Sequence, residues 1–147
     1  MVVYREHAFL CFLEVRVMEQ LLVYGQRVEE LLEQMAKSSL WQVRLSIAKY
    51  KDTPFSILEK LSKDESDEVR MAVAEHPKAT VILLEEMSFD PCWMVRWAVA
   101  YHMSTSRKVL ERLAQDEKWR VRLTAEKCLE EAISHLEKKE LVGVRLA

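Results

Sequence analysis

Apolar and polar positions along this chain repeat with a period of 26 residues. Two dipeptides mark the period. Val-Arg occurs at 43–44, 69–70, 95–96 and 121–122, and Leu-Glu occurs at 32–33, 58–59, 84–85, 110–111 and 136–137. A fixed period of this size is typical of a solenoid, in which each unit buries its apolar face only against its neighbours.

Each repeat divides into two amphipathic halves, and both have helical spacing. Residues 69–76 carry buried-type side chains at i, i+3, i+4 and i+7, and Pro77 then stops the helix because proline cannot continue the hydrogen-bond ladder. Residues 57–61 form the second stripe. Thr53 before them suits a helix N-cap and Pro54 the first helical position. The pattern therefore predicts two short helices in each repeat.

The two ends of the chain depart from the pattern of its middle. One period before Val43 lies Val17, but Met18 replaces the arginine there. At the other end, two apolar rows finish in His135 and Lys139, as an outward-facing terminal repeat requires. We therefore expect one domain over 1–147, with an N-terminal capping helix at 1–24, repeats over 17–118 and a C-terminal cap at 119–147.

Composition supports short helices and excludes several classes of protein. Only two glycines and three prolines occur in 147 residues, which leaves little room for hairpins. Lys and Arg total 22 against 24 Asp and Glu, so the net charge of −2 lacks the basic excess of a nucleic-acid binder. No apolar run approaches the roughly 18 residues of a membrane span. Cys11, Cys92 and Cys128 are widely spaced, so we expect reduced thiols, a cytoplasmic setting and no metal or other cofactor.

Residues 69–77, with Leu83-Leu84 after them and Asp90 before the next Val-Arg, resemble the leucine-rich repeat variant, a family of HEAT-like helical repeats. The resemblance covers residues 31–128. It departs from the family pattern where Lys51 and Met103 replace proline, and where Tyr50, His76 and His102 replace the usual asparagine. The family implies an all-α, right-handed α-α superhelix, here of about four to five 26-residue repeats, and allows one helix of each repeat to be 3₁₀. It implies no single activity.

Aspartate and arginine recur in fixed register. Three aspartates each precede an arginine by six residues: Asp64 and Arg70, Asp90 and Arg96, and Asp116 and Arg122. This spacing predicts an Asp–Arg ladder between neighbouring repeats, with Asp90 bridging to Arg96, because a partly buried guanidinium favours planar bidentate pairing with a carboxylate. A basic ligand-binding ridge is the alternative.

Two further rows of side chains favour structural roles. The glutamates at 33, 59, 85, 111 and 137 predict a solvated outer face that would repel a polyanion. His76 and His102 share a row with Tyr24, Tyr50 and Cys128. A metal site would need its ligands within about 2.0–2.3 Å of one ion, whereas successive repeats hold them far apart. Half-buried packing with a polar tip is the favoured interpretation.

The aromatic residues form the candidate partner-binding site. Trp93, Trp97 and Tyr101 are spaced i, i+4 and i+8 along one helix, while Trp41 and Trp119 occupy the row of Trp93 in other repeats. This stripe is displaced from the face that should meet the core, and large aromatics on a second face are enriched at interaction sites. Packing between repeats is the alternative, because the row of Trp97 is apolar throughout.

These observations favour a non-catalytic scaffold that binds another protein or a peptide. The sequence carries no phosphate-binding glycine loop and no H-E-x-x-H motif. One alternative is an accessory or regulatory enzyme subunit, because related helical repeats include phycobilisome lyase subunits and DNA-repair glycosylases. Another is a structural homo-oligomer. Residues 8–13 are apolar nearly all round a helix, which predicts a homodimer through Phe9 and Phe12 unless this helix folds back across the first two repeats.

Overall fold

The computed structural model describes residues 24, 25 and 27–144, and every regular element among them is an α-helix. A helical stretch at 27–36 comes first. It is followed by α2 (Trp41–Lys49), α3 (Phe55–Leu61), α4 (Asp67–Ala74), α5 (Val81–Met87), α6 (Trp93–Tyr101), α7 (Arg107–Leu113) and α8 (Trp119–Val144). The all-α fold class is confirmed. The 3₁₀ segments that the family resemblance allows do not occur in the described residues.

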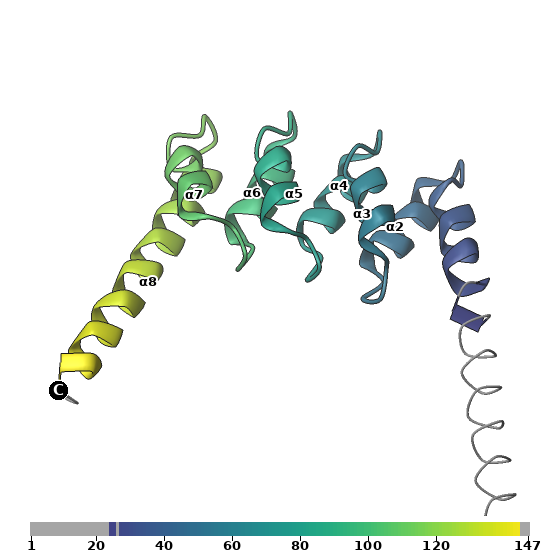
Figure 1. The fold of residues 1–147 in the computed structure, drawn as a ribbon. Helices are drawn as coiled ribbons and strands as arrows, with labels where there is room; N and C mark the ends of the chain where they lie inside the picture. Colours follow the sequence, from purple (N-terminus) through teal and green to yellow (C-terminus); the bar gives the residue numbers. More distant parts are fainter. Residues whose placement is uncertain (1–23, 26, 145–147) are drawn as a thin grey trace, which may run out of the picture.

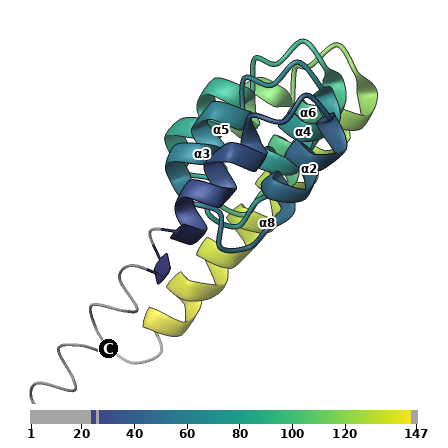
Figure 2. The same ribbon diagram turned by 90° about the vertical axis from the view of Figure 1, so that its right-hand side faces the viewer.

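The helices are arranged in two layers. In one layer α2 packs on α4, α4 on α6, and α6 on α8. The second layer holds α3, α5 and α7, each of which contacts at least one helix of the first. Figure 1 shows the helix pairs side by side in chain order, with α8 projecting at the C-terminal end, and Figure 2 shows α3 and α5 on the opposite side from α2, α4 and α6.

Helices of each layer begin at matching positions of the sequence pattern. The first layer begins at Trp41, Asp67, Trp93 and Trp119, and the second at Phe55, Val81 and Arg107. Successive members of each series are 26 residues apart. The helix starts therefore follow the period of the sequence.

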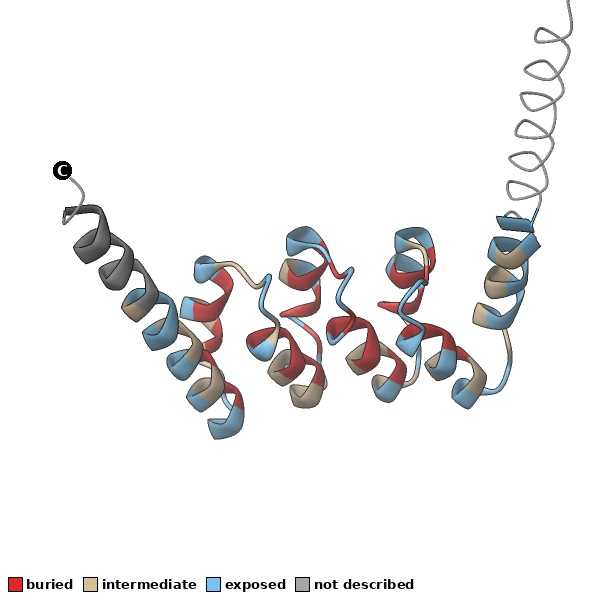
Figure 3. Ribbon diagram, turned by 90° about the horizontal axis from the view of Figure 1, so that it is seen from below, coloured by how far each residue is buried: buried red, intermediate tan, exposed pale blue. Residues whose placement is uncertain are grey.

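The core lies between the two layers, where buried positions face one another (Figure 3). Val69, Val95 and Val121 are fully buried in the first layer. Ile57, Leu58 and Leu84 are fully buried in the second layer. Each such side chain contributes about 1.5–3 kcal/mol relative to leaving it exposed, so burial of these rows is a large stabilising contribution.

The first-layer helix α4 ends earlier than the apolar spacing predicts. It stops at Ala74, so His76 lies beyond the helix and not on its last turn. Pro77 disfavours the helical conformation at the residue before it. The His76 ring compensates by accepting a hydrogen bond from the Lys78 N–H at its Nδ1 atom, at 3.1 Å.

The second-layer helices also begin one residue later than predicted. Thr53 is not an N-cap. It is fully buried, and its hydroxyl donates to the Ile47 carbonyl at 2.7 Å, which ties the turn to the end of α2. The N-cap position of α3 belongs to Pro54. One and two periods later, Thr80 and Ser106 occupy that position and cap α5 and α7 by accepting the N–H groups of residues 83 and 109.

The N-terminal segment lies outside the described residues. The predicted cap at 1–24 falls there except for residue 24, as does the predicted dimer contact through Phe9 and Phe12. Both remain predictions.

A row of alanines sets how closely the first-layer helices approach. Ala48 and Ala74 are 0% exposed and Ala100 is 1% exposed. Each follows by four residues an arginine that bonds to the next helix pair, so it shares that face of the helix. The same row ends in Glu126 on α8, which is exposed. Small side chains allow close helix packing, so the row permits stacking as far as α8 and introduces a charge there.

Ala100→Leu should therefore cost about 1–3 kcal/mol of unfolding free energy, because it forces extra volume between α6 and α8. The matched change is Glu126→Leu in the same row, which should alter stability by less than about 0.5 kcal/mol because that position is exposed. Urea unfolding followed by circular dichroism measures both. Equal losses for the two variants would contradict the close-packing role of the row.

Candidate functional site

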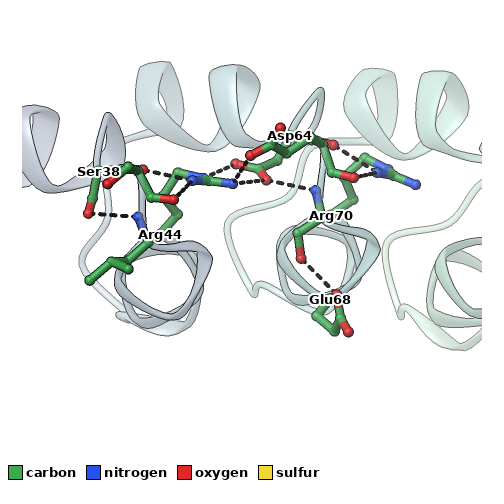
Figure 4. Close-up of polar contacts among 9 residues, drawn as sticks. Ser38, Arg44, Asp64, Glu68 and Arg70 are labelled. Carbon is green, nitrogen blue, oxygen red and sulfur yellow. Dashed lines mark hydrogen bonds and ion pairs between the residues drawn. The ribbon is translucent and has the colours of Figure 1, made fainter.

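Arginines in the first turns of α2, α4 and α6 bridge each helix pair to the next. Each Nε atom lies 2.6–2.7 Å from an aspartate Oδ2 atom, and each Nη2 atom lies 2.9–3.1 Å from the Oδ1 atom of the same carboxylate. The pairs are Arg44–Asp64, Arg70–Asp90 and Arg96–Asp116, named the ladder below. Figure 4 shows the Arg44–Asp64 rung, with Arg70 extending toward the next.

Each ladder arginine also holds the turn that precedes its own helix. The Nη1 atom donates to the carbonyl oxygen six residues earlier, at 2.7 Å for Arg70 and Arg96 alike. The aspartate in turn accepts the backbone N–H two residues ahead, as Asp116 does from Lys118 at 2.8 Å. One guanidinium thus links two successive turns.

The predicted pairing of Asp90 with Arg96 is wrong in register. The Arg96 side chain pairs with Asp116 and contacts only the main-chain carbonyl of Asp90. The Asp90 carboxylate belongs to Arg70, one helix pair earlier. Both carboxylate oxygens of Asp90 bind Arg70, and Oδ1 also accepts the N–H of its own turn at Cys92. The carboxylate therefore points toward the preceding helix pair and not toward Arg96.

The ladder has different ends. Ser38 stands one period before Asp64, and its hydroxyl accepts the Leu40 N–H at 3.2 Å. It reproduces the turn without a carboxylate. At the other end, Arg122 donates to the carbonyls of Asp116 and Glu117 at 2.7 and 3.0 Å, but no carboxylate among the described residues pairs with it. The helix α8 continues through the position where the next aspartate turn would lie.

The ladder shifts the acid–base equilibria of its members. Burial acts to raise the pKa of Asp64 and Asp116, but arginine hydrogen bonds, turn N–H groups and arginine charges outweigh it and hold each pKa below the usual value. Hydrogen bonding to Asp116 raises the pKa of Arg96 despite its burial. The carboxylates are therefore held in their charged form.

The histidines form a second set of links, at the turns between the layers. The Nε2 atom of His76 lies 3.0 Å from the Tyr50 carbonyl, and that of His102 lies 3.2 Å from the His76 carbonyl. Because each Nδ1 atom accepts a backbone N–H, Nε2 carries the proton and donates. Within the described part of the chain, no three potential metal-binding side chains converge.

Trp93 and Trp119 lie on neighbouring helices and share one cation. The guanidinium carbon of Arg120 is 5.8 Å from the ring centre of Trp93 and 5.4 Å from that of Trp119. These are cation–π distances. A small cavity of about 130 Å³ lies at this point, lined by the two tryptophans, Arg120 and Lys118.

Trp97 and Tyr101 extend this surface along α6. The Trp97 indole donates from Nε1 to the Thr124 hydroxyl at 3.0 Å, which fixes it against α8. Its ring stacks on Tyr101 with centres 6.0 Å apart and planes 17° from parallel. Tyr101 is 71% exposed, Trp119 61% and Leu123 56%. We call Trp93, Trp97, Tyr101, Trp119 and Leu123 the α6–α8 surface.

Trp41 does not join this surface. It lies on α2, which packs on α4, and the intervening position of the tryptophan row is Asp67. The three tryptophans on α6 and α8 differ in exposure. Trp93 and Trp97 are half-buried between helices, while Trp119 is exposed to solvent.

Sequence reasoning missed the cations of this surface and the first arginine of the ladder. Lys118 and Arg120 flank Trp119 directly in the sequence, and that triplet was the available signal. The row of Arg120 holds Gln42, Glu68 and Met94 in the earlier helices, so the repeat pattern hides it. Arg44 lacks an aspartate six residues before it, so the Asp-to-Arg spacing of six did not identify it as a member of the ladder.

A second, shallow groove of about 470 Å³ borders the last rung of the ladder, between the turns at 88–91 and 115–117. The guanidinium of Arg112 stacks 3.7 Å above the Phe89 ring centre and contacts the Ser88 hydroxyl. The groove therefore lies on an edge that is already cross-linked by Arg96 and Asp116.

Three of the five predicted glutamates, Glu59, Glu85 and Glu111, lie on second-layer helices, and the line is partly neutralised. Lys60 pairs with Glu33 at 3.0 Å, and Lys108 with Glu85 at 3.3 Å, across consecutive helix pairs. The Lys60 hydrogen bond lowers the pKa of Glu33. The line remains acidic but carries less charge than the sequence alone indicates.

Two of the three cysteines lie in the described part of the chain, and both are free thiols. Cys92 is half-buried and donates to an Asp67 carboxylate oxygen at 3.3 Å. Burial, with the charge of Glu131, raises the pKa of the Cys128 thiol, which disfavours the reactive thiolate.

Comparison with known proteins finds no matching family model and no matching curated protein. Among the helices described here, none is both long enough and apolar enough to cross a membrane.

The ladder register predicts the outcome of two double-mutant cycles. Arg96→Ala should cost about 3 kcal/mol because it leaves the Asp116 carboxylate buried and unpaired. Combined with Asp116→Ala, it should show a coupling energy of about 1–3 kcal/mol. The matched cycle of Arg96→Ala with Asp90→Ala should couple much more weakly. Guanidinium chloride denaturation measures the three single variants, the two double variants and the wild type, and stronger coupling to Asp90 would contradict the observed register.

The pKa shifts also predict a loss of stability in acid. A carboxylate with a lowered folded pKa contributes stability that is present above its unfolded pKa of about 3.9 and is lost as the pH falls through the folded pKa. The unfolding free energy should therefore fall between about pH 5 and pH 2. An Asp116→Asn variant should be less stable at pH 7 but lose less on acidification. Parallel pH profiles for the two proteins would refute this contribution.

Proposed function

We propose that this chain is a right-handed helical-repeat solenoid of the leucine-rich repeat variant type, and that it works as a non-catalytic module for binding other proteins. The 26-residue spacing of helix starts in both layers supports the solenoid. Ion pairs that repeat between consecutive helix pairs also support it, because each unit of a solenoid is held by its neighbours.

The observation that carries the binding function is the exposure of the α6–α8 surface. Tyr101, Trp119 and Leu123 are more than half exposed, and they lie beside aromatic rings that hydrogen bonds and packing already hold in place. Rigid, exposed aromatic side chains lose little conformational entropy on binding and dominate many protein interfaces. Trp97 supports the neighbouring Tyr101 ring, and Tyr101 and Trp119 are the side chains that would contact the partner protein.

Two candidate acid–base groups near this surface already have structural partners, which supports a module without catalysis. Asp116 is committed to Arg96, and His102 to the His76 carbonyl. A general base needs its lone pair free toward a substrate proton, and these groups already use theirs. The exposed members of the surface itself are Tyr101, Trp119 and Leu123, which offer contact area but no carboxylate or imidazole.

Affinity capture tests the proposal. The wild-type chain, immobilised, is compared with a Tyr101→Ser, Trp119→Ser double variant in extracts of cells that express it. The matched control is Ile82→Ser, which removes a side chain that is 73% exposed on the opposite layer. Circular dichroism melts establish that all three proteins fold.

We expect proteins captured by the wild type and the Ile82 variant to fall by about tenfold or more with the double variant, since anchor residues each contribute 2 kcal/mol or more. A captured protein is then purified and its binding measured by calorimetry against the same three chains. Equal binding to all three would reject the α6–α8 surface as the docking face.

A further inference from the structure

The C-terminal end of the ladder offers a carboxylate-binding position without its carboxylate. Arg44, Arg70 and Arg96 each bind a carboxylate through Nε and Nη2 while Nη1 holds the preceding turn. Arg122 makes the same Nη1 contacts, at 2.7 and 3.0 Å, so its guanidinium is held by its own turn in the same way. Its remaining edge has the donor geometry that accepts a bidentate carboxylate in three earlier places.

Two further cations lie within four residues of Arg122 in the sequence, at the start of α8. Lys118 and Arg120 have no carboxylate within 4.0 Å among the described residues, and neither does Arg122. The first turn of α8 contains no acidic residue. Three positive charges without a carboxylate partner among the described residues therefore lie within residues 118–122, on a chain whose net charge is −2.

An apolar recess adjoins the cations. The cavity of about 130 Å³ between Trp93 and Trp119 is lined by Lys118 and Arg120 themselves. Trp119 lies three residues before Arg122, so the two side chains share one helix face. A ligand that reaches Arg122 can therefore also contact the tryptophan rings.

The residues of this end distinguish between its potential occupants. A further repeat would pack its helix against the alanine row, but Glu126 replaces alanine on α8 and blocks that approach. A second copy stacked head to tail would bring Ser38, which has no carboxylate, to Arg122. The glutamates at 126, 130 and 131 further along the helix repel any long polyanion, so they favour a ligand with few charges at the start of α8. A short acidic segment with an apolar side chain fits this end, because it carries few charges and also offers a group for the recess.

We propose that the C-terminal end of the array binds an acidic peptide segment of another protein. One carboxylate of the segment completes the rung at Arg122, neighbouring acids pair with Arg120 and Lys118, and an apolar side chain enters the Trp93–Trp119 cavity. The inference rests on the proposed binding function and names the chemistry of its partner.

Fluorescence anisotropy with defined probes tests this. The probe is a short fluorescein-labelled peptide of aspartate, glutamate and serine with one central leucine. Its control replaces every acid by the corresponding amide. The chain is used whole, as wild type, Arg122→Ala, Arg120→Ala and the matched Arg107→Ala, which removes an exposed positive charge on α7. A single-stranded DNA oligonucleotide of equal charge and a fluorescein-labelled copy of the chain are measured in parallel.

We expect the acidic peptide to bind the wild type and the Arg107 variant equally. Arg122→Ala and Arg120→Ala should each weaken binding by about tenfold, since a charge-assisted hydrogen bond is lost. Affinity should fall with added salt. The amide peptide should not bind. Because Arg122→Ala also removes contacts to its own turn, Arg120→Ala gives an independent measurement on a side chain without hydrogen-bond partners in the described residues.

Several results would overturn the inference. These are no binding of the acidic peptide, equal binding to all four chains, tighter binding of the DNA, or self-association that Arg122→Ala abolishes. If capture depends on Tyr101 and Trp119 while the acidic peptide does not bind, only this inference fails. If capture is insensitive to those residues, the proposed function fails whatever the peptide does.

Discussion

The arrangement of this molecule depends on one guanidinium that faces two turns at once. In Arg70, Nη1 holds the turn before its own helix, while Nε and Nη2 hold the Asp90 carboxylate of the next turn. Asp90 in turn accepts the N–H of Cys92 and so shapes the start of α6. A buried ion pair adds little net stability compared with apolar packing, but an incomplete one is costly. The ladder therefore acts mainly on register: consecutive helix pairs that slip relative to each other leave buried charges unpaired.

Close packing of the first layer depends on a second constraint, the size of one side chain. Alanine at 48, 74 and 100 allows each helix to lie against the next, and glutamate at 126 ends the series. The ladder and the alanine row stop at the same helix. α8 remains helical where the next aspartate turn would lie, and it carries Glu126 in place of the next alanine. Two independent features thus end the stacking at α8.

Sequence periodicity predicts the helices well because burial repeats with them. The 26-residue spacing of the helix starts, the all-α class and the buried valine and leucine rows follow from the pattern. The ladder register does not, because an aspartate six residues before an arginine and one 20 residues after it belong to the same row when the period is 26. Only the direction in which the arginine and aspartate side chains extend distinguishes these two possible pairings. The roles of Thr53 and His76 were missed for a similar reason: both bond to main-chain carbonyls, which a side-chain pattern does not contain.

The aromatic surface follows from the same rows, at the point where they stop being covered. Trp93, Trp97 and Arg96 on α6 are half-buried because α8 lies against that side of the helix. Their counterparts one period later are Trp119, Leu123 and Arg122. In that position the tryptophan and the leucine are more than half exposed, and the arginine lacks its carboxylate among the described residues. No new residue type is needed for the binding surface that we propose here. Groups that hold one helix pair to the next inside the molecule are available at its end to hold something else.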